Sequence, residues 1–214
     1  MRLAFVSLMA GASWGGSEEL WSDTALLALE QGHDVFVSVY NWGELPVKLR
    51  ELKNKGAHVH LRQRYNSSFS LFKKATNYFI NRSRLIGNPY LPIFTFAPDS
   101  IFINQGDNFC IAVHHKQLKE LLEKHGIPYI LMCHNHAQYS SIPQSNIYPE
   151  AVSFYKKAKR VLFVSERMKY VTQRQLCCDL PNASIVQNTI GIKDLKILNL
   201  PESETVQFAA VGYL

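Results

Sequence analysis

The sequence predicts an α/β fold in which a parallel β-sheet is flanked by helices. Three observations predict it. Seven short apolar runs recur along the 214 residues, and stretches with a helical pattern lie between them. Several of these runs are apolar at nearly every position, as in strands that are covered on both faces. The alternation of strands and helices favours parallel pairing with right-handed crossovers.

The elements follow from this alternation in order. The predicted strands are residues 2–8, 34–40, 57–61, 100–104, 128–133, 160–165 and 184–188, and the predicted helices are residues 17–31, 108–125, 149–158 and 166–177. Gly126 is a candidate C-cap for the second helix. The N-terminal stretch MRLAFVSLMAGAS also fits a signal peptide, but its apolar run is short and leads into a helical pattern, which favours a strand.

The apolar runs and the cysteines of the sequence indicate the cellular compartment of the protein. No run approaches the roughly 18 apolar residues of a membrane-spanning helix. The four cysteines, Cys110, Cys133, Cys177 and Cys178, have the spacing neither of a disulfide framework nor of a metal site. We therefore expect reduced thiols in a cytoplasmic protein.

Two adjacent glycines, Gly15 and Gly16, separate the first predicted strand from the first predicted helix. Ligands of open α/β sheets bind at this carboxyl edge. Glycines there allow a close approach of the backbone and a positive φ, and the N–H groups of a helix N-terminus suit a phosphate. The alternative is a tight turn, with Ser17 as N-cap and with Glu18 and Glu19 favoured by the helix dipole. The residues alone support both interpretations equally.

Two common nucleotide-binding motifs are absent. The glycines at positions 11, 15 and 16 do not form G-x-G-x-x-G, and the second strand ends in Tyr40-Asn41 rather than in an acidic residue that could bind a ribose. There is also no G-K-[ST] phosphate loop. These absences argue against a dinucleotide-dependent oxidoreductase and an ATPase.

A second group of polar residues, His134, Asn135 and His136, follows the buried strand 128–133 at the same edge. A histidine there can move a proton or hydrogen-bond a substrate, and a structural histidine is the alternative. The two histidines could also bind a metal, but no third ligand lies nearby in the sequence, so we expect none. Ser165 is expected to cap the helix that follows it, and Asn188 ends the last predicted strand at a turn.

Several short motifs occur in a characteristic order: GGSE (15–18), Leu29 with Gly32, His33 and Val35, PDSIFINQG (98–106), IPYILMCHNH (127–136), VLFVSERMK (161–169) and SIVQNTIG (184–191). Together they resemble the amino-terminal half of a GT-B glycosyltransferase, most closely of the group 1 (family 4) retaining enzymes. The resemblance covers essentially the whole chain. Thr189 departs from the pattern, because a glycine is common there.

The resemblance implies a Rossmann-like domain, one half of a GT-B fold. It implies transfer of a hexosyl-type sugar from a nucleotide-sugar to a glycan or lipid-linked acceptor, in polysaccharide or glycolipid biosynthesis. No metal or cofactor is expected besides this co-substrate.

The same resemblance implies roles for individual residues. Gly15, Gly16 and Ser17 would approach the donor diphosphate, and His134, or His136 if the register shifts, would contact the sugar as the catalytic residue. A carboxylate at Glu18 would repel the diphosphate unless it points away or caps the helix. The residues expected at the acceptor side or in the cleft are Glu18, Gln105, Asn135, Ser165 and Asn188.

The resemblance also divides the chain. Residues 1–205 would form the amino-terminal domain. Residues 206–214 (VQFAAVGYL) resemble the first strand of the donor-binding domain, with Tyr213 where arginine is usual. We therefore expect a truncated chain that is inactive alone. The alternative is a stand-alone, non-catalytic module of the same fold that binds a glycan or a nucleotide.

Positive charge is concentrated in one segment. The formal net charge is +6, and residues 52–98 contain eight Lys and Arg but no Asp or Glu. Within it, Lys73, Lys74, Arg82 and Arg84 alternate with aromatic residues. An amphipathic helix with a solvated basic face explains this pattern, and so does docking on an anionic membrane surface, which would place the protein on the inner face of the membrane. Binding of single-stranded nucleic acid is a third explanation of the pattern. No nucleic-acid-binding motif accompanies the segment, so we expect no nucleic-acid partner.

Overall fold

The computed structural model describes residues 1–63, 87–107, 109–134 and 144–188. In this part of the chain seven strands form one parallel sheet in the order β3-β2-β1-β4-β5-β6-β7. The fold is therefore the predicted Rossmann-like α/β fold. The strands are β1 (Arg2–Ser7), β2 (Asp34–Tyr40), β3 (His58–Arg62), β4 (Ser100–Gln105), β5 (Tyr129–Cys133), β6 (Arg160–Phe163) and β7 (Ala183–Ile185).

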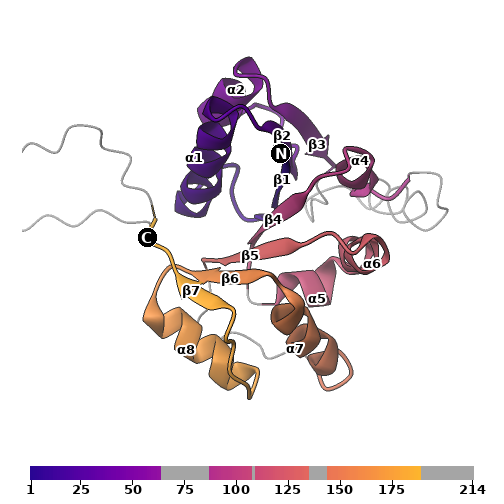
Figure 1. The fold of residues 1–214 in the computed structure, drawn as a ribbon, viewed down its shortest axis with the longest axis vertical. Helices are drawn as coiled ribbons and strands as arrows, with labels where there is room; N and C mark the ends of the chain where they lie inside the picture. Colours follow the sequence, from indigo (N-terminus) through magenta and orange to yellow (C-terminus); the bar gives the residue numbers. More distant parts are fainter. Residues whose placement is uncertain (64–86, 108, 135–143, 189–214) are drawn as a thin grey trace, which may run out of the picture.

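Helices cover both faces of the sheet. Figure 1 shows α1 and α2 on one side of the sheet and α4, α5, α6 and α7 on the other. The helices are α1 (Gly16–Glu30), α2 (Val47–Asn54), α4 (Leu91–Thr95), α5 (Cys110–His114), α6 (Lys116–His125), α7 (Tyr148–Lys157) and α8 (Glu166–Gln175).

Alternate residues of the interior strand β1 enter two separate cores, because successive strand side chains point to opposite faces. Phe5 packs with buried residues of α1 and α2, such as Trp21 and Leu52. Ala4 and Val6 belong to the core that includes residues of α5, α6 and α7. Both faces of β1 are therefore covered, which explains its nearly continuous apolar sequence.

The predicted helix over residues 108–125 was wrong in one respect, because the structure has two helices there. The helical geometry is interrupted at His115, whose φ of −120° and ψ of 44° are not helical. The His115 side chain is bonded to the hydroxyl of Tyr90 at 2.8 Å, which holds this residue against α4. Gly126 ends α6 with a φ of 63°, as predicted for a C-cap. The short helices α2 and α4 were not predicted.

None of the described helices has the length and hydrophobicity needed to cross a membrane. All four cysteines are free thiols; Cys110 and Cys133 are buried, and Cys177 is exposed. The expected start of a second domain at residues 206–214 lies outside the described residues, as do Lys73, Lys74, Arg82, Arg84, Asn135 and His136.

Candidate functional site

The strand order reverses direction between β1 and β4, so a crevice is expected at their carboxyl ends. The two strand ends lie very close to each other. The N–H of Leu8 donates to the carbonyl oxygen of Asn104 at 2.9 Å. A Cβ added to Gly106 would lie 2.6 Å from the carbonyl oxygen of Leu8. Glycine at position 106 therefore lets the chain leave β4 directly beside the loop that follows β1.

The glycine pair lies at the start of α1, as predicted. Gly15 is the N-cap, with a φ of −160° and a ψ of 176°, and neither glycine has a positive φ. The expected positive φ was therefore wrong, because extended backbone connects the loop to the helix. A Cβ added to Gly15 or Gly16 would meet nothing within 4 Å. The structure thus leaves open space over both glycines.

The alternative interpretation, with Ser17 as the N-cap of α1, was wrong on that residue, because the helix begins at Gly16 and Gly15 is its N-cap. No side chain caps its N-terminus. The Ser17 hydroxyl oxygen is buried, and it has no hydrogen-bond partner among the described residues. The first turn of α1 therefore presents main-chain N–H groups that donate no hydrogen bond to a capping side chain.

Glu18 points away from the open end of the helix, into the space between α1 and the sheet. It is 4% exposed. Its Oε1 accepts from the Ser7 hydroxyl at 2.6 Å, and its Oε2 accepts from Asn104 Nδ2 at 2.6 Å and Trp21 Nε1 at 2.5 Å. Burial raises the pKa of Glu18, and the three hydrogen bonds oppose that rise. The carboxyl group joins α1 to β1 and β4 at the switch point.

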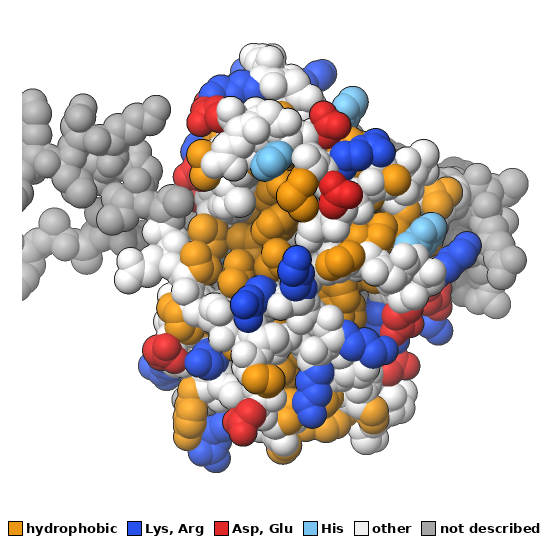
Figure 2. Space-filling view, viewed as in Figure 1, with side chains coloured by type: hydrophobic (Ala, Val, Ile, Leu, Met, Phe, Trp, Pro, Cys, Tyr) orange, Lys and Arg blue, Asp and Glu red, His pale blue; other side chains and the backbone are white. Residues whose placement is uncertain are grey.

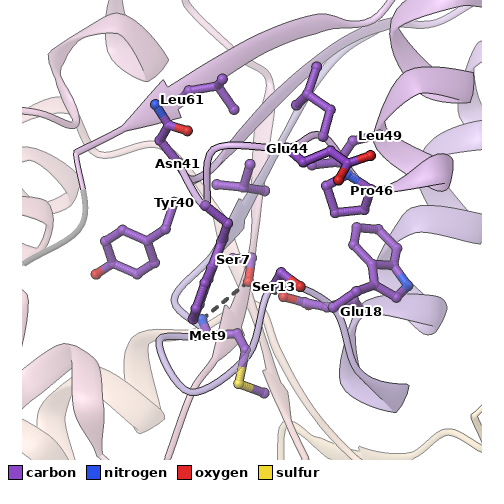
Figure 3. Close-up of a pocket in the computed structure, with 14 residues that line it drawn as sticks. Ser7, Met9, Ser13, Glu18, Tyr40, Asn41, Glu44, Pro46, Leu49 and Leu61 are labelled. Carbon is purple, nitrogen blue, oxygen red and sulfur yellow. Dashed lines mark hydrogen bonds between the residues drawn. The ribbon is translucent and has the colours of Figure 1, made fainter. Parts of the chain in front are cut away.

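A small pocket lies beside Glu18, between the loops that follow β1 and β2 (Figure 3). It has room for roughly one water molecule. Its lining includes Ser7, Ser13, Glu18, Glu44 and Leu49. Figure 3 shows the ring of Tyr40 turned away from the side of the pocket where Glu18, Glu44 and Leu49 lie.

Arg62 is a residue of this edge that sequence reasoning missed. It is one of the eight basic residues of the segment 52–98, but its side chain is only 2% exposed. Its Nη2 donates to the carbonyl oxygen of Ser7, and its guanidinium lies 4.5 Å from the ring centre of Tyr40 and 4.9 Å from that of Tyr90. The available signal was its position directly after the predicted strand 57–61, at the carboxyl edge.

His134 follows β5 at the same edge. Both of its ring nitrogens are buried, and neither has a hydrogen-bond partner among the described residues. Burial lowers the pKa of His134 to about 4, because the charged imidazolium is poorly solvated. The ring is therefore neutral at pH 7, with one nitrogen able to donate a hydrogen bond and the other able to accept one.

The other predicted site residues lie in different surroundings. Gln105 is buried, and its Nε2 donates to the hydroxyl of Tyr155 at 2.8 Å, so its amide is used within the core. Ser165 caps α8 as predicted, since its hydroxyl accepts from the N–H of Met168 at 3.2 Å. Asn188 is exposed beyond the end of β7.

The structure therefore brings some of the predicted residues together and separates others. Gly15, Gly16 and Glu18 lie at the switch point, and His134 ends β5, which is the neighbour of β4. Ser165 and Asn188 lie farther along the same edge, beyond β6 and β7. On the face shown in Figure 2, hydrophobic side chains line a hollow in the upper half of the molecule, and basic side chains stand at its lower rim. The described residues contain no group of three His, Cys, Asp or Glu that could hold a metal.

Comparison with known proteins shows a likeness in structure only. No family model and no curated protein sequence matches the chain. HepE of Anabaena in complex with UDP-glucose matches 89% of this chain and 44% of its own, with a TM-score of 0.52 and 14% identity. HepE in complex with UDP matches with a TM-score of 0.51 over the same shares. A glycosyltransferase from Rickettsia africae has a TM-score of 0.49 and 15% identity, over 87% of this chain and 42% of that one.

The chain thus spans less than half the length of these proteins. At this level of identity the likeness shows the fold. The Rossmann-like sheet of this chain is similar to that of a protein whose structure was solved with a nucleotide-sugar bound.

Proposed function

We propose that the chain is the acceptor-side domain of a GT-B glycosyltransferase, of the group 1 (family 4) type. The enzyme would transfer a hexosyl group from a nucleotide-sugar to a glycan or lipid-linked acceptor, in polysaccharide or glycolipid biosynthesis. The observation that carries the proposal is the uncapped N-terminus of α1, with open space over Gly15 and Gly16, at the switch point of the sheet. The likeness to HepE with UDP-glucose supports the class of donor.

The start of α1 suits a diphosphate for three reasons. Its main-chain N–H groups carry partial positive charge from the helix dipole. Glycines without a side chain allow an anion to come close to the backbone. Glu18 is bonded to Ser7, Asn104 and Trp21 and is therefore directed away from this end. Charge that develops on a leaving diphosphate would be stabilised here.

His134 is the proposed catalytic residue. A neutral imidazole whose two nitrogens have no partner in the described part of the chain can donate to a sugar hydroxyl and accept from another group. Its lowered pKa keeps it neutral at pH 7, so it would polarise the donor sugar by hydrogen bonding rather than by a full charge. Ser165 and Asn188 would line the acceptor side of the cleft.

The nucleotide would be held mainly by a second domain that begins at about residue 206, as the GT-B resemblance implies. The chain alone would then lack most of its donor affinity. The reaction proposed uses the nucleotide-sugar as co-substrate and no metal. The protein would work in the cytoplasm, beside the inner face of the membrane.

The test is a substitution of His134 by Ala in the full-length protein that contains this chain. The assay measures the release of UDP from UDP-glucose in the presence of a set of glycan acceptors. The kcat of the variant should be lower than that of the wild type by roughly 100-fold or more. The KM for the donor should change little. The matched control is His58→Ala, because His58 is exposed and begins β3 at the opposite edge of the sheet.

Three outcomes would count against the proposal. Transfer by His134→Ala within about 3-fold of the wild type would remove the catalytic role. An equal loss in His58→Ala would show that the effect is not specific to the site. A full-length protein that binds a nucleotide or a glycan but transfers no sugar would be the stand-alone binding module instead.

A further inference from the structure

The guanidinium of Arg62 is buried and incompletely hydrogen-bonded. An arginine side chain stays protonated in proteins, yet no described carboxylate forms an ion pair with Arg62. Only its Nη2 has an acceptor, the carbonyl oxygen of Ser7. Its Nε and Nη1 have no hydrogen-bond partner among the described residues. A buried and incompletely paired charge is costly to a folded chain, so an arginine in this state points to a partner that is absent.

The groups around Arg62 are aromatic or neutral. The rings of Tyr40 and Tyr90 pack against the guanidinium. The hydroxyl of Tyr90 is bonded to Nδ1 of His115. Burial, together with the positive charge of Arg62, lowers the pKa of His115 to about 3, and burial raises the pKa of Cys110 to about 12. None of these groups supplies a negative charge at pH 7. The described carboxyl group that acts on Arg62 electrostatically is Glu18, which forms no ion pair with it and whose own pKa is raised by burial.

The position of Arg62 relates it to the candidate donor site. His60 and Arg62 point to the same face of the sheet, because alternate strand residues share a face. His60 contacts Phe36, which belongs to the core on the α5–α7 side. Arg62 and Glu18 therefore approach the end of β1 from opposite faces, one through the carbonyl oxygen of Ser7 and the other through its hydroxyl.

We propose that Arg62, with Tyr40 and Tyr90, binds a phosphate monoester group, and that this group belongs to the acceptor. A guanidinium matches the oxygens of a phosphate closely, and the tyrosine hydroxyls add neutral hydrogen-bonding groups. Tyr40 is only partly buried, so a rotation of its side chain would give the anion access to Arg62. The assignment of the phosphate to the acceptor rests on the proposed function. The proposal of an anion site at Arg62 does not depend on that function.

The test measures phosphate binding by the chain without any nucleotide-sugar. The melting temperature is followed with inorganic phosphate, with glycerol 1-phosphate, and with sodium chloride at the same ionic strength. At about 100 times the dissociation constant, phosphate should raise the melting temperature by roughly 5 °C or more. Arg62→Met should melt at the same or a higher temperature without anion, because a buried charge is replaced by an apolar side chain. It should lose the phosphate-dependent rise.

The matched control is Arg160→Met, because Arg160 is exposed at the start of β6, at the opposite edge of the sheet. This variant should keep the rise. A rise in Arg62→Met equal to that of the wild type, or no rise in the wild type, would overturn the proposal. Vesicles of phosphatidic acid compared with phosphatidylcholine distinguish a lipid headgroup from a soluble phosphate monoester as the source.

A second measurement needs no variant, and so decides the matter if Arg62→Met does not fold. In the wild-type chain, the Nε–H resonance of Arg62 should move in a saturable way as phosphate is added, and should not move with chloride. An unmoved resonance would overturn the proposal. Since neither experiment involves turnover, failure here leaves the glycosyltransferase proposal intact, and absence of transfer leaves the anion site intact.

Discussion

Buried polar side chains decide how the first helix meets the sheet. The carboxyl group of Glu18 accepts hydrogen bonds from β1, from β4 and from its own helix, through Ser7, Asn104 and Trp21. One side chain therefore sets the spacing of three elements at the switch point. The same arrangement keeps its negative charge away from the open end of α1.

We expect Glu18→Ala to lower the free energy of unfolding by about 3 kcal/mol, because three buried donors lose their acceptor. Urea denaturation at pH 7 measures this. The control is Glu166→Ala, since Glu166 is exposed and forms only a 3.9 Å pair with Lys169; it should lose less than about 1 kcal/mol. A loss below 1 kcal/mol in Glu18→Ala would show that the three bonds do not hold the switch point together.

At this scale, the sequence identifies residues by their place after a strand. Gly15, Gly16, His134 and Ser165 were found in that way. The partners of Glu18 were not found, because Ser7 and Asn104 come together only when β1 pairs with β4. Arg62 is one of the basic residues of the segment 52–98, and its burial was not predicted, since the burial of a charged side chain depends on tertiary contacts rather than on its neighbours in the sequence.

Whole strands were easier to predict than helices. A strand covered on both faces is apolar at nearly every position, and this signal is hard to miss. The helices α2 and α4 are short, with 8 and 5 residues, so their apolar pattern covers only about two turns and about one turn. The break between α5 and α6 follows from the contact of His115 with Tyr90, a residue that is distant in the sequence.

The close approach of the strand ends at the switch point gives a prediction for Gly106. In Gly106→Ala, the new Cβ would lie 2.6 Å from the carbonyl oxygen of Leu8, so the two backbones must separate. We expect a loss of about 2 kcal/mol in the free energy of unfolding, in the range of overpacked cores. Thermal and urea unfolding measure it.

Gly15→Ala and Gly16→Ala are the matched controls, because the structure leaves room for a Cβ at both positions. Both should stay within about 1 kcal/mol of the wild type. If Gly106→Ala is equally well tolerated, the loop after β4 does not need its present contact with Leu8. In the full-length protein, the same two control variants should reduce sugar transfer if the glycines approach the donor.

At the scale of the molecule, one sheet separates two cores and presents a single carboxyl edge where the polar residues collect. This arrangement was predictable, since strand–helix alternation fixes parallel pairing and places all carboxyl ends together. The charge of the molecule was also evident, at +6 overall. Which surface carries that charge cannot be deduced from composition alone, as the burial of Arg62 shows.

The membrane interpretation of the basic segment predicts binding to anionic vesicles. Replacing Lys73, Lys74, Arg82 and Arg84 by Gln should weaken binding to phosphatidylglycerol vesicles by roughly 1000-fold, at about 1 kcal/mol for each charge. Co-sedimentation at low and high salt measures it.

The control for this variant changes the same amount of charge elsewhere, at four exposed lysines, Lys116, Lys124, Lys156 and Lys157. It should keep most of the binding. Equal losses in the two variants would indicate attraction by net charge alone. Binding that is absent at every salt concentration would rule out the membrane interpretation.

The interior position of β1, between β2 and β4, has a consequence for synthesis of the chain. Leu3 pairs with Val35 on one side and with Ser100 on the other. At about 5 to 20 residues per second, β4 leaves the ribosome several seconds or more after β1 and β2. During that interval the apolar strand β1 has one unpaired edge, which can pair with another nascent chain. The length of this vulnerable interval is therefore set by the order of the strands in the sequence, and it ends when β4 leaves the ribosome and pairs with β1.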